Sequence, residues 1–417
     1  MQRTPLLGAL ALAVPAVLSA QSTTAITARR MLDLRAGRMI ENPVVVVQGD
    51  RIVSVGTSAP AGVTPLDLGD VTLLPGFMDL HTHLGYDLEG DWAMRPVTET
   101  AVDAALRAVP NARKTLLAGF TTVREVGEEG GVDVSLMKAI DAGGIVGPRI
   151  VPAREAIGIT GGHCDVTGFR PGVAEGGTGV ADGVDGVLKA VRYQIKYGAK
   201  VIKVCATAGV LSFEGPVGAQ QLSDEELRTI VDEASRHGLK VAAHAHGADG
   251  ILAAVRAGVA SIEHGSMIND QIIALMKQKG TYLVPTTYLA DRINMAALPP
   301  RIRAKAEYVI PLAKENLRRA IKAGVRIAFG TDAGVYPHGE NAHEFGALVD
   351  RGMSPLEALR TATLNAADLL GVDDRGEIAA GKLADLVAVP GNPLVDIHVT
   401  ERVTWVMKGG VVVSSTR

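Results

Sequence analysis

The sequence is poor in cysteine and in net charge, and each shortage excludes a class of protein. Its 417 residues include two cysteines, Cys164 and Cys205, so the chain is not a small scaffold built from disulfides. An exported protein could pair these two residues. Both lie beside segments that carry candidate site residues, however, and we expect buried free thiols. The formal net charge is −3 and no basic block occurs, which argues against nucleic-acid binding.

After residue 20 the sequence also lacks an apolar stretch long enough to span a membrane. The first twenty residues combine a positive start at residues 1–3, an apolar run at 6–18 and a small-residue exit at Leu18-Ser19-Ala20. This pattern predicts a secretory signal peptide, residues 1–20, cleaved after about Ala20. A membrane anchor is the alternative, but the run is short and no charged stop follows it. We therefore expect a secreted or periplasmic protein without a stable membrane anchor.

Both ends of the remaining chain carry short strand patterns. Residues 44–48 and 51–55 are rich in β-branched side chains and flank the turn signal Gly49-Asp50. Similar patterns occupy residues 384–389, 403–407 and 411–413 near the other end. The sequence therefore predicts a small β-sandwich domain built from residues 22–72 plus 373–417.

The middle of the chain, residues 73–372, alternates strand and helix patterns. Strand patterns occupy residues 74–80, 121–125, 149–154, 200–205, 240–245, 260–263, 281–285 and 326–330, and helical patterns include 182–197, 223–237 and 301–322. Eight strands, each followed by a helix, predict an α/β fold of the (β/α)₈ TIM-barrel type. An open doubly wound sheet would carry a Gly-rich loop after its first strand, where this sequence has His81-Thr82-His83.

Side chains that can bind metal ions follow the predicted strands at the ends where barrel active sites form. They are His81 and His83 after the first strand, Lys203 in the fourth, His244 and His246 after the fifth, His264 after the sixth and Asp332 after the eighth. Residues two apart in a strand share a face, so His81 and His83 can bind one ion.

Each of these residues also has a purely structural interpretation. His81 and His83 alone would fit a strand with two hydrogen-bonded histidines equally well. Lys203 could be paired with an acidic residue, and Asp332 could cap a turn. The spacing does not decide whether His244 or His246 binds metal. Together, however, so many polar side chains at strand ends predict a metal site, because buried polar groups need partners.

With these motifs the chain resembles the metal-dependent amidohydrolases, in particular the imidazolonepropionase-like and prolidase-like branch that includes Xaa-Pro dipeptidases and ochratoxin-hydrolysing enzymes. The resemblance covers essentially the whole mature chain and rests on residues 74–83, 202–203, 244–247, 261–265, 330–332 and 376–387. It implies two divalent metal ions. Zn²⁺ suits the histidine and carboxylate ligands and is expected, although manganese or cobalt could substitute. The resemblance also implies that His81, His83 and Asp332 bind the first ion, that His244 and His264 bind the second, and that a carboxylated Lys203 bridges both.

The resemblance further implies catalytic roles. Asp332 would act as the base for a hydroxide that bridges the two metals. The sequence itself offers His163, after the third strand, as a contact for the substrate's carbonyl or carboxylate, and Tyr288, after the seventh, as a hydroxyl donor to the same oxygen. His246 could face the pocket beside His244. Each of these three residues also has a structural interpretation, which for Tyr288 is equally open. A substrate carboxylate also needs a cation, and the candidates are Arg95, Arg124 and Arg154.

The function implied is cleavage of the amide bond to a C-terminal amino acid in dipeptides or N-acyl amino acids, possible substrates including ochratoxin A. The alternative is a cyclic-amide or imidazolone hydrolase, which would lack dipeptidase activity and a carboxylate clamp. A third hypothesis is a catalytically inactive barrel used for binding, against which the complete ligand set argues. The expected ligand is a small peptide-like or N-acyl amino acid substrate, and the chain is expected to form a homo-oligomer.

Overall fold

The computed structural model describes residues 23–88, 90 and 92–415. The expected signal peptide, residues 1–20, lies outside these residues. Within the described ranges, no helix is sufficiently long and apolar to cross a membrane.

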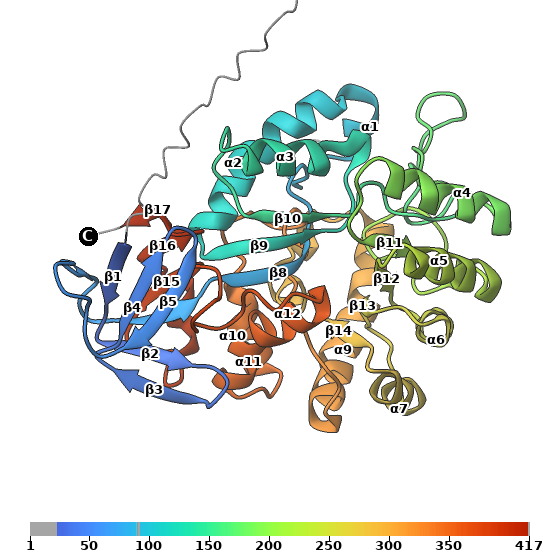
Figure 1. Cartoon of the computed structure of the whole chain (residues 1–417). Coiled ribbons are helices and arrows are strands. Elements are labelled where there is room, and N and C mark those ends of the chain that lie inside the picture. The colour runs from blue at the N-terminus through green and yellow to red at the C-terminus, as the bar shows by residue number, and fades with distance from the viewer. Residues whose placement is uncertain (1–22, 89, 91, 416–417) are drawn as a thin grey trace, which may run out of the picture.

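Strands from both ends of the chain form a β-rich part (Figure 1). Its strands are β1 (Thr23–Thr27), β2 (Arg30–Asp33), β3 (Arg38–Glu41), β4 (Val44–Gln48), β5 (Arg51–Gly56), β6 (Leu66–Asp67), β7 (Val71–Pro75), β15 (Leu386–Pro390), β16 (Trp405–Lys408) and β17 (Val411–Ser415). One sheet has the order β5-β4-β1-β6 and the other β17-β16-β15-β7-β2-β3. The pairing of β15 with β7 joins the two ends of the chain.

Side chains from both sheets share one apolar cluster. Ile26 and Val45 of the first sheet and Leu73, Leu386 and Trp405 of the second are all buried in it. The predicted hairpin around Gly49 is present as the antiparallel pair β4–β5. Strand β4 has four valines in a row, and they alternate between two apolar clusters, Val45 and Val47 in this one and Val44 and Val46 in another.

The middle of the chain contains two parallel sheets. The first, in the order β10-β9-β8, contains β8 (Phe77–Thr82), β9 (Phe120–Glu125) and β10 (Arg149–Pro152); the second contains β11 (Ile202–Cys205), β12 (Val241–Ala245), β13 (Ser261–His264) and β14 (Tyr282–Val284). Every residue of β8, β9, β11 and β12 is buried. Such burial is typical of parallel strands covered on both faces.

The eighth predicted strand, residues 326–330, is not a regular strand in the structure. It makes one parallel bridge, between Ile327 and Leu283, and the backbone N–H of Leu80 donates to Phe329 at 2.9 Å. On the other side, the carbonyl oxygen of Pro152 in β10 accepts a hydrogen bond from the Lys200 N–H, just before β11, and a parallel bridge joins Ile157, after β10, to Val204. Backbone hydrogen bonds therefore connect the first sheet to the second at both of its edges.

Helices lie outside the parallel strands; Figure 1 shows α4 to α7 along the outer side of β11 to β14. The helices are α1 (Arg95–Thr98), α2 (Ala101–Leu117), α3 (Val132–Asp141), α4 (Gly183–Lys196), α5 (Asp224–Arg236), α6 (Ala248–Ala257), α7 (Asp270–Lys279), α8 (Leu289–Arg292), α9 (Pro300–Ala323), α10 (His343–Asp350), α11 (Pro355–Thr361) and α12 (Leu364–Leu370), with 3₁₀ turns η1 (Trp92–Met94), η2 (Glu129–Gly131), η3 (Met295–Ala297) and η4 (Ile397–Glu401). Helix α5 begins where a capping box predicts, because the Ser223 side chain accepts a hydrogen bond from the Glu226 N–H.

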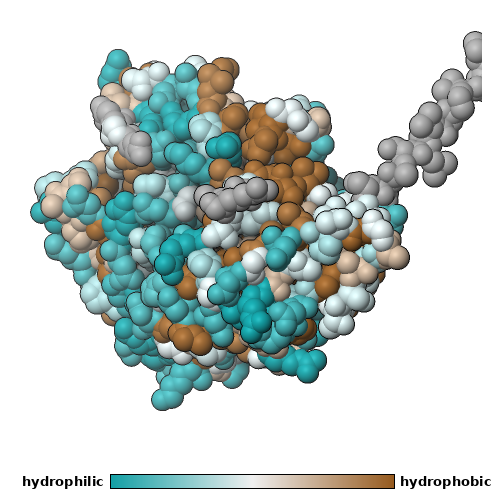
Figure 2. Space-filling model, turned by 90° about the vertical axis from the view of Figure 1, so that its left-hand side faces the viewer, coloured by the Kyte–Doolittle hydropathy of each residue, from teal (hydrophilic) through white to brown (hydrophobic). Residues whose placement is uncertain are grey.

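The β-rich part exposes apolar side chains along its edge strand β17. Val411 is 63% exposed and Val412 43%. Figure 2, which views the side of the molecule at the left of Figure 1, shows a hydrophobic area among mostly hydrophilic residues.

Candidate metal centre

The structure gathers the predicted ligands into two clusters. The first contains His81, His83 and Asp332, and the second His244, His246 and His264; within each cluster the potential ligand atoms lie within 4.8 Å of one another. The clusters adjoin, since the ring centroids of His81 and His264 are 5.0 Å apart. Five of the six residues come from three strand ends, β8, β12 and β13, because parallel strands end at the same edge.

In the first cluster both imidazoles direct Nε2 toward one carboxylate. Oδ1 of Asp332 lies 3.5 Å from Nε2 of His81 and 3.3 Å from Nε2 of His83. The opposite ring nitrogens are occupied, because Nδ1 of His81 lies 2.8 Å from Glu263 and Nδ1 of His83 lies 3.1 Å from the Gly127 carbonyl oxygen. Bonds of this kind orient a ligand histidine and leave Nε2 for the metal.

The second cluster has the same arrangement at two of its three rings. Nδ1 of His246 lies 2.8 Å from the Ser266 hydroxyl, and Nδ1 of His264 lies 2.8 Å from the Thr286 hydroxyl. Nε2 of His244 is buried and has no hydrogen-bond partner within the described part of the chain. A buried nitrogen without a partner is costly, and a metal ion would satisfy it. The donor set therefore fits two metal ions that prefer imidazole and carboxylate ligands.

Electrostatics favour the ligand forms of these groups. Burial lowers the pKa of His81 to about 4 and holds the pKa of His244 and His264 well below the usual value, so these rings are neutral and offer a lone pair. Burial alone would raise the pKa of Asp332, but the adjacent His81 and His83 outweigh it and hold that pKa well below its usual range.

Lys203 lies buried in β11, near the carboxylates of Glu263 and Asp332. Burial lowers the pKa of Lys203 to about 8, although the nearby charges of Glu263 and Asp332 oppose this change. The side chain therefore loses its proton more readily than an exposed lysine. A neutral amine is the form that can capture carbon dioxide.

Three residues at the centre adopt a left-handed backbone that L-residues rarely use. The φ angles are 68° for His264, 49° for Thr286 and 61° for Asp332. Such conformations cost about 1–3 kcal/mol each and cluster at functional sites. Here two of the three belong to ligand candidates and the third to the hydroxyl partner of His264.

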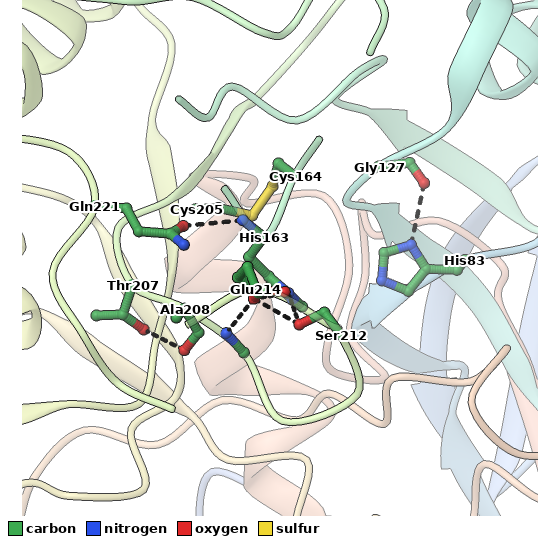
Figure 3. The surroundings of a disulfide bond; sticks show 11 residues. His83, Gly127, His163, Cys164, Cys205, Thr207, Ala208, Ser212, Glu214 and Gln221 are labelled. Atoms are coloured by element: carbon green, nitrogen blue, oxygen red, sulfur yellow. Dashed lines mark hydrogen bonds and ion pairs between the residues drawn. A yellow bond between two sulfur atoms is a disulfide. The ribbon is translucent and has the colours of Figure 1, made fainter. Parts of the chain in front are cut away.

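His163 lies directly against the second cluster. Its ring stacks on His244 with centroids 4.1 Å apart. The next residue, Cys164, forms a disulfide with Cys205, with their Cα atoms 5.9 Å apart (Figure 3). The prediction of free thiols was therefore wrong. The segment after β10 folds back along β11, where the Ile157 N–H donates to the Lys203 carbonyl oxygen and the Cys205 N–H donates to that of Ile157. This brings the two cysteines within disulfide range.

Tyr288 contacts residues that belong to neither histidine cluster. Its ring contacts Tyr336 and His343, with centroids 5.2 and 4.9 Å away, and its backbone N–H donates to the buried carboxylate of Glu344. Its predicted role as a hydroxyl donor to the substrate stays a prediction.

The three arginine candidates are engaged by the protein itself. Arg124 is buried and donates to Leu80, Ser261 and Glu263 through its three guanidinium nitrogens. Arg154 donates to the Gln194 side chain and the Tyr197 carbonyl. Arg95 forms an ion pair with Asp87. The structure therefore gives Arg124 a role beneath the centre rather than toward a substrate.

Two acidic residues that support the centre were not predicted as such. Glu263 bonds both His81 and Arg124, and Asp79 accepts hydrogen bonds from Thr331 and Asn341, which fixes the segment before Asp332. A detectable signal existed in the sequence, because an acidic residue inside an apolar strand beside a candidate ligand needs a buried partner.

Comparison with known proteins agrees with this geometry. The model of the amidohydrolase family matches residues 72–413. Ochratoxinase of Aspergillus niger is 36% identical over 405 residues, which cover 90% of this chain and 83% of that protein. A solved Xaa-Pro dipeptidase with methionine bound in its active site is 39% identical, covering 94% of this chain and 100% of the other, with a TM-score of 0.89. An imidazolonepropionase of Streptomyces griseus subsp. griseus is 26% identical and covers 86% of this chain and 90% of that protein.

These matches confirm the predicted resemblance, and the two metal-ligand clusters lie within the region that the family model covers. The chain belongs to the amidohydrolase family and is a metal-dependent enzyme that hydrolyses amide bonds.

Proposed function

We propose that this enzyme cleaves the amide bond to a C-terminal amino acid in dipeptides or N-acyl amino acids. The observation that carries the proposal is the pair of adjoining clusters, one of them with an acidic residue, in a chain similar to a dipeptidase and to ochratoxinase. The methionine bound to the dipeptidase is a free amino acid, as a C-terminal product would be. We interpret the two connected parallel sheets as one (β/α)₈ barrel, residues 73–372, beside a β-sandwich of residues 22–72 plus 373–417.

In this proposal His81, His83 and Asp332 would hold one Zn²⁺, His244 and His264 would hold a second, and a carboxylated Lys203 would supply further anionic oxygen ligands. The metals, when bound, would polarise the scissile carbonyl and make water more acidic. Asp332 accepts a proton from the attacking water and returns it to the leaving amine. His163, stacked on His244, contacts the carbonyl or carboxylate oxygen of the substrate.

We also propose that the protein is exported after removal of residues 1–20 and acts as a homo-oligomer. The disulfide between Cys164 and Cys205 supports export, because disulfides persist in oxidising compartments. Exposed Val411 and Val412 on the edge strand β17 offer apolar surface to a second copy. Mass spectrometry of the exported protein tests the first statement, because the mass of the chain gives the position of the new N-terminus. The mass of the native particle tests the second.

The function is tested with purified mature protein reconstituted with zinc. The test substrates are Xaa-Pro dipeptides, N-acyl amino acids and ochratoxin A. Each is compared with the derivative in which the C-terminal carboxylate is a carboxamide. Imidazolonepropionate tests the cyclic-amide alternative. We expect two metal ions per chain, turnover of the acids, little turnover of their carboxamides, and loss of activity with a chelator. Cleavage of the cyclic substrate alone would support the imidazolone alternative instead.

A further inference from the structure

A short loop between β11 and α5, residues 209–214, encloses the ring of His163 (Figure 3). The ring is packed so closely against Gly209 that a Cβ there would lie 2.2 Å from Cε1 of His163. Nδ1 of His163 lies 2.8 Å from the Ser212 hydroxyl and 3.2 Å from Oε1 of Glu214. With His244 stacked on the ring, the loop holds His163 from several sides.

The hydrogen bonds determine which ring nitrogen carries a proton. The Ser212 hydroxyl donates to Oε1 of Glu214 at 2.6 Å, so its single proton is not available to His163. An ionised carboxylate only accepts, and the contact with His163 lowers the pKa of Glu214 to about 2 despite its burial. Nδ1 must therefore be the donor to Ser212 and Glu214, and Nε2 is the ring nitrogen left for a ligand.

The loop is itself fixed from two directions. The buried side chain of Lys305, on α9, donates to the carbonyl oxygens of Gly209, Ser212 and Glu214 at 3.2, 2.9 and 2.9 Å. The Gly209 N–H donates to Oε1 of Glu214 at 2.9 Å. Gly209, Ser212 and His163 thus all contact Oε1 of Glu214, while Oε2 is buried without a partner in the described part of the chain. A buried carboxylate with one unpaired oxygen costs free energy of folding. A function of Oε1 at the site would explain why this carboxylate is present.

We propose that Glu214 is a positioning residue that holds His163 with Nδ1 as donor and Nε2 directed to the substrate. This inference rests on the proposed function only in naming the ligand as the substrate's carbonyl or carboxylate. Glu214 acts through His163, so its contribution to turnover exists only when the imidazole is present.

Steady-state kinetics of four variants test this dependence. Glu214→Ala should lower kcat/KM about 10–100-fold, the range for partners that orient a functional histidine, at unchanged zinc content. Glu214→Gln keeps an acceptor at Oε1 and should recover most of the loss. His163→Ala should lose activity, and adding Glu214→Ala to it should cost nothing further. Additive losses in the double variant overturn the proposal, because they place the effect of Glu214 elsewhere.

Glu233→Ala is the matched control for Glu214→Ala. Glu233 is another buried carboxylate, with its side chain 3% exposed, and it pairs with Arg192 on the helical surface. It should leave kcat/KM unchanged. A loss as large as that of Glu214→Ala would show that removing any buried carboxylate has this effect, and would overturn the proposal.

A readout without substrate separates this inference from the proposed function. In the zinc-loaded wild-type protein, ¹⁵N-histidine NMR reports which ring nitrogen carries a proton, and the His163 signals are those lost in His163→Ala. We expect a protonated Nδ1. A proton on Nε2 with a bare Nδ1 overturns the inference, whatever the enzyme cleaves. The wild-type protein could instead show the expected Nδ1 proton but no activity on any carboxylate substrate. That result would contradict the proposed function and still support the positioning of His163.

Discussion

Nδ1 of His81 lies 2.8 Å from one oxygen of Glu263, and the other oxygen of the same carboxylate lies 2.8 Å from the guanidinium of Arg124. All three side chains are buried. Glu263 therefore links a metal-ligand candidate to a fixed cation and turns Nε2 of His81 toward Asp332. The metal centre thus depends on an ion pair beneath it.

Replacing Glu263 by Gln should both destabilise the protein and weaken metal binding. It leaves Arg124 buried without its charge partner, a change that costs about 3–5 kcal/mol in comparable buried pairs. Loss of the oriented histidine should weaken zinc binding about 10–100-fold. Urea denaturation and zinc titration measure the two effects. Unchanged values for both would show that the ion pair does not support the centre.

Asp332→Asn should keep the protein folded and reduce kcat by at least about 10²–10⁴-fold, the usual contribution of a general base. KM should change little, because the lost interaction belongs to the transition state. Zinc content has to be measured on the same sample, since the carboxylate also belongs to the first cluster. An unchanged kcat at full zinc content would move the base to His246 or His163.

Lys203→Ala should lose zinc and activity if the lysine is carboxylated. A short carboxylic acid added to this variant should partly restore both, by supplying the missing anionic oxygens. Lys203→Arg should remain inactive, because a guanidinium stays charged and cannot capture carbon dioxide. A fully active arginine variant would show that the lysine has a structural role alone.

Replacing both Cys164 and Cys205 by Ala should reduce the free energy of unfolding by about 4 kcal/mol, the loop-closure estimate for the 41-residue separation. Activity should fall as well, because Cys164 follows His163 directly. The comparison is made by urea denaturation and kinetics, with the reduced wild-type protein as a second sample. Equal stability and turnover in all samples would mean that the disulfide does not hold this segment.

Glu344 should make stability depend on pH. Burial raises the pKa of Glu344 to about 8 from the usual 4.5, so between these values the unfolded chain releases a proton that the folded protein retains. Stability should therefore fall as the pH rises from about 4.5 to about 8. One pKa unit corresponds to about 1.4 kcal/mol.

Glu344→Gln removes this titration. Urea denaturation at pH 5 and pH 9 should show the wild-type protein losing stability relative to the variant at the higher pH. A constant difference between the two proteins would contradict a raised pKa at this position.

Many strands and helices could be predicted from the sequence, because the order of apolar and polar residues in a segment reflects which of its faces are buried. Apolar runs such as those of β8 and β12 predict strands buried on both faces, and the capping box at Ser223 predicts the start of α5. The segment around residue 327 was predicted as a strand although it makes a single bridge with Leu283, since residue type alone does not fix the length of a ladder.

The sequence alone also placed His81, His83, His244, His264 and Asp332 at strand ends, which follows from the alternation of strands and helices and the shared edge of parallel strands. Tertiary structure decided what surrounds them. Neither the pairing of Cys164 with Cys205 nor the contact between Glu214 and His163 follows from spacing, because residues 41 and 51 positions apart meet only when the chain folds back over β11. Long-range contacts of this kind depend on the packed fold and not on local pattern.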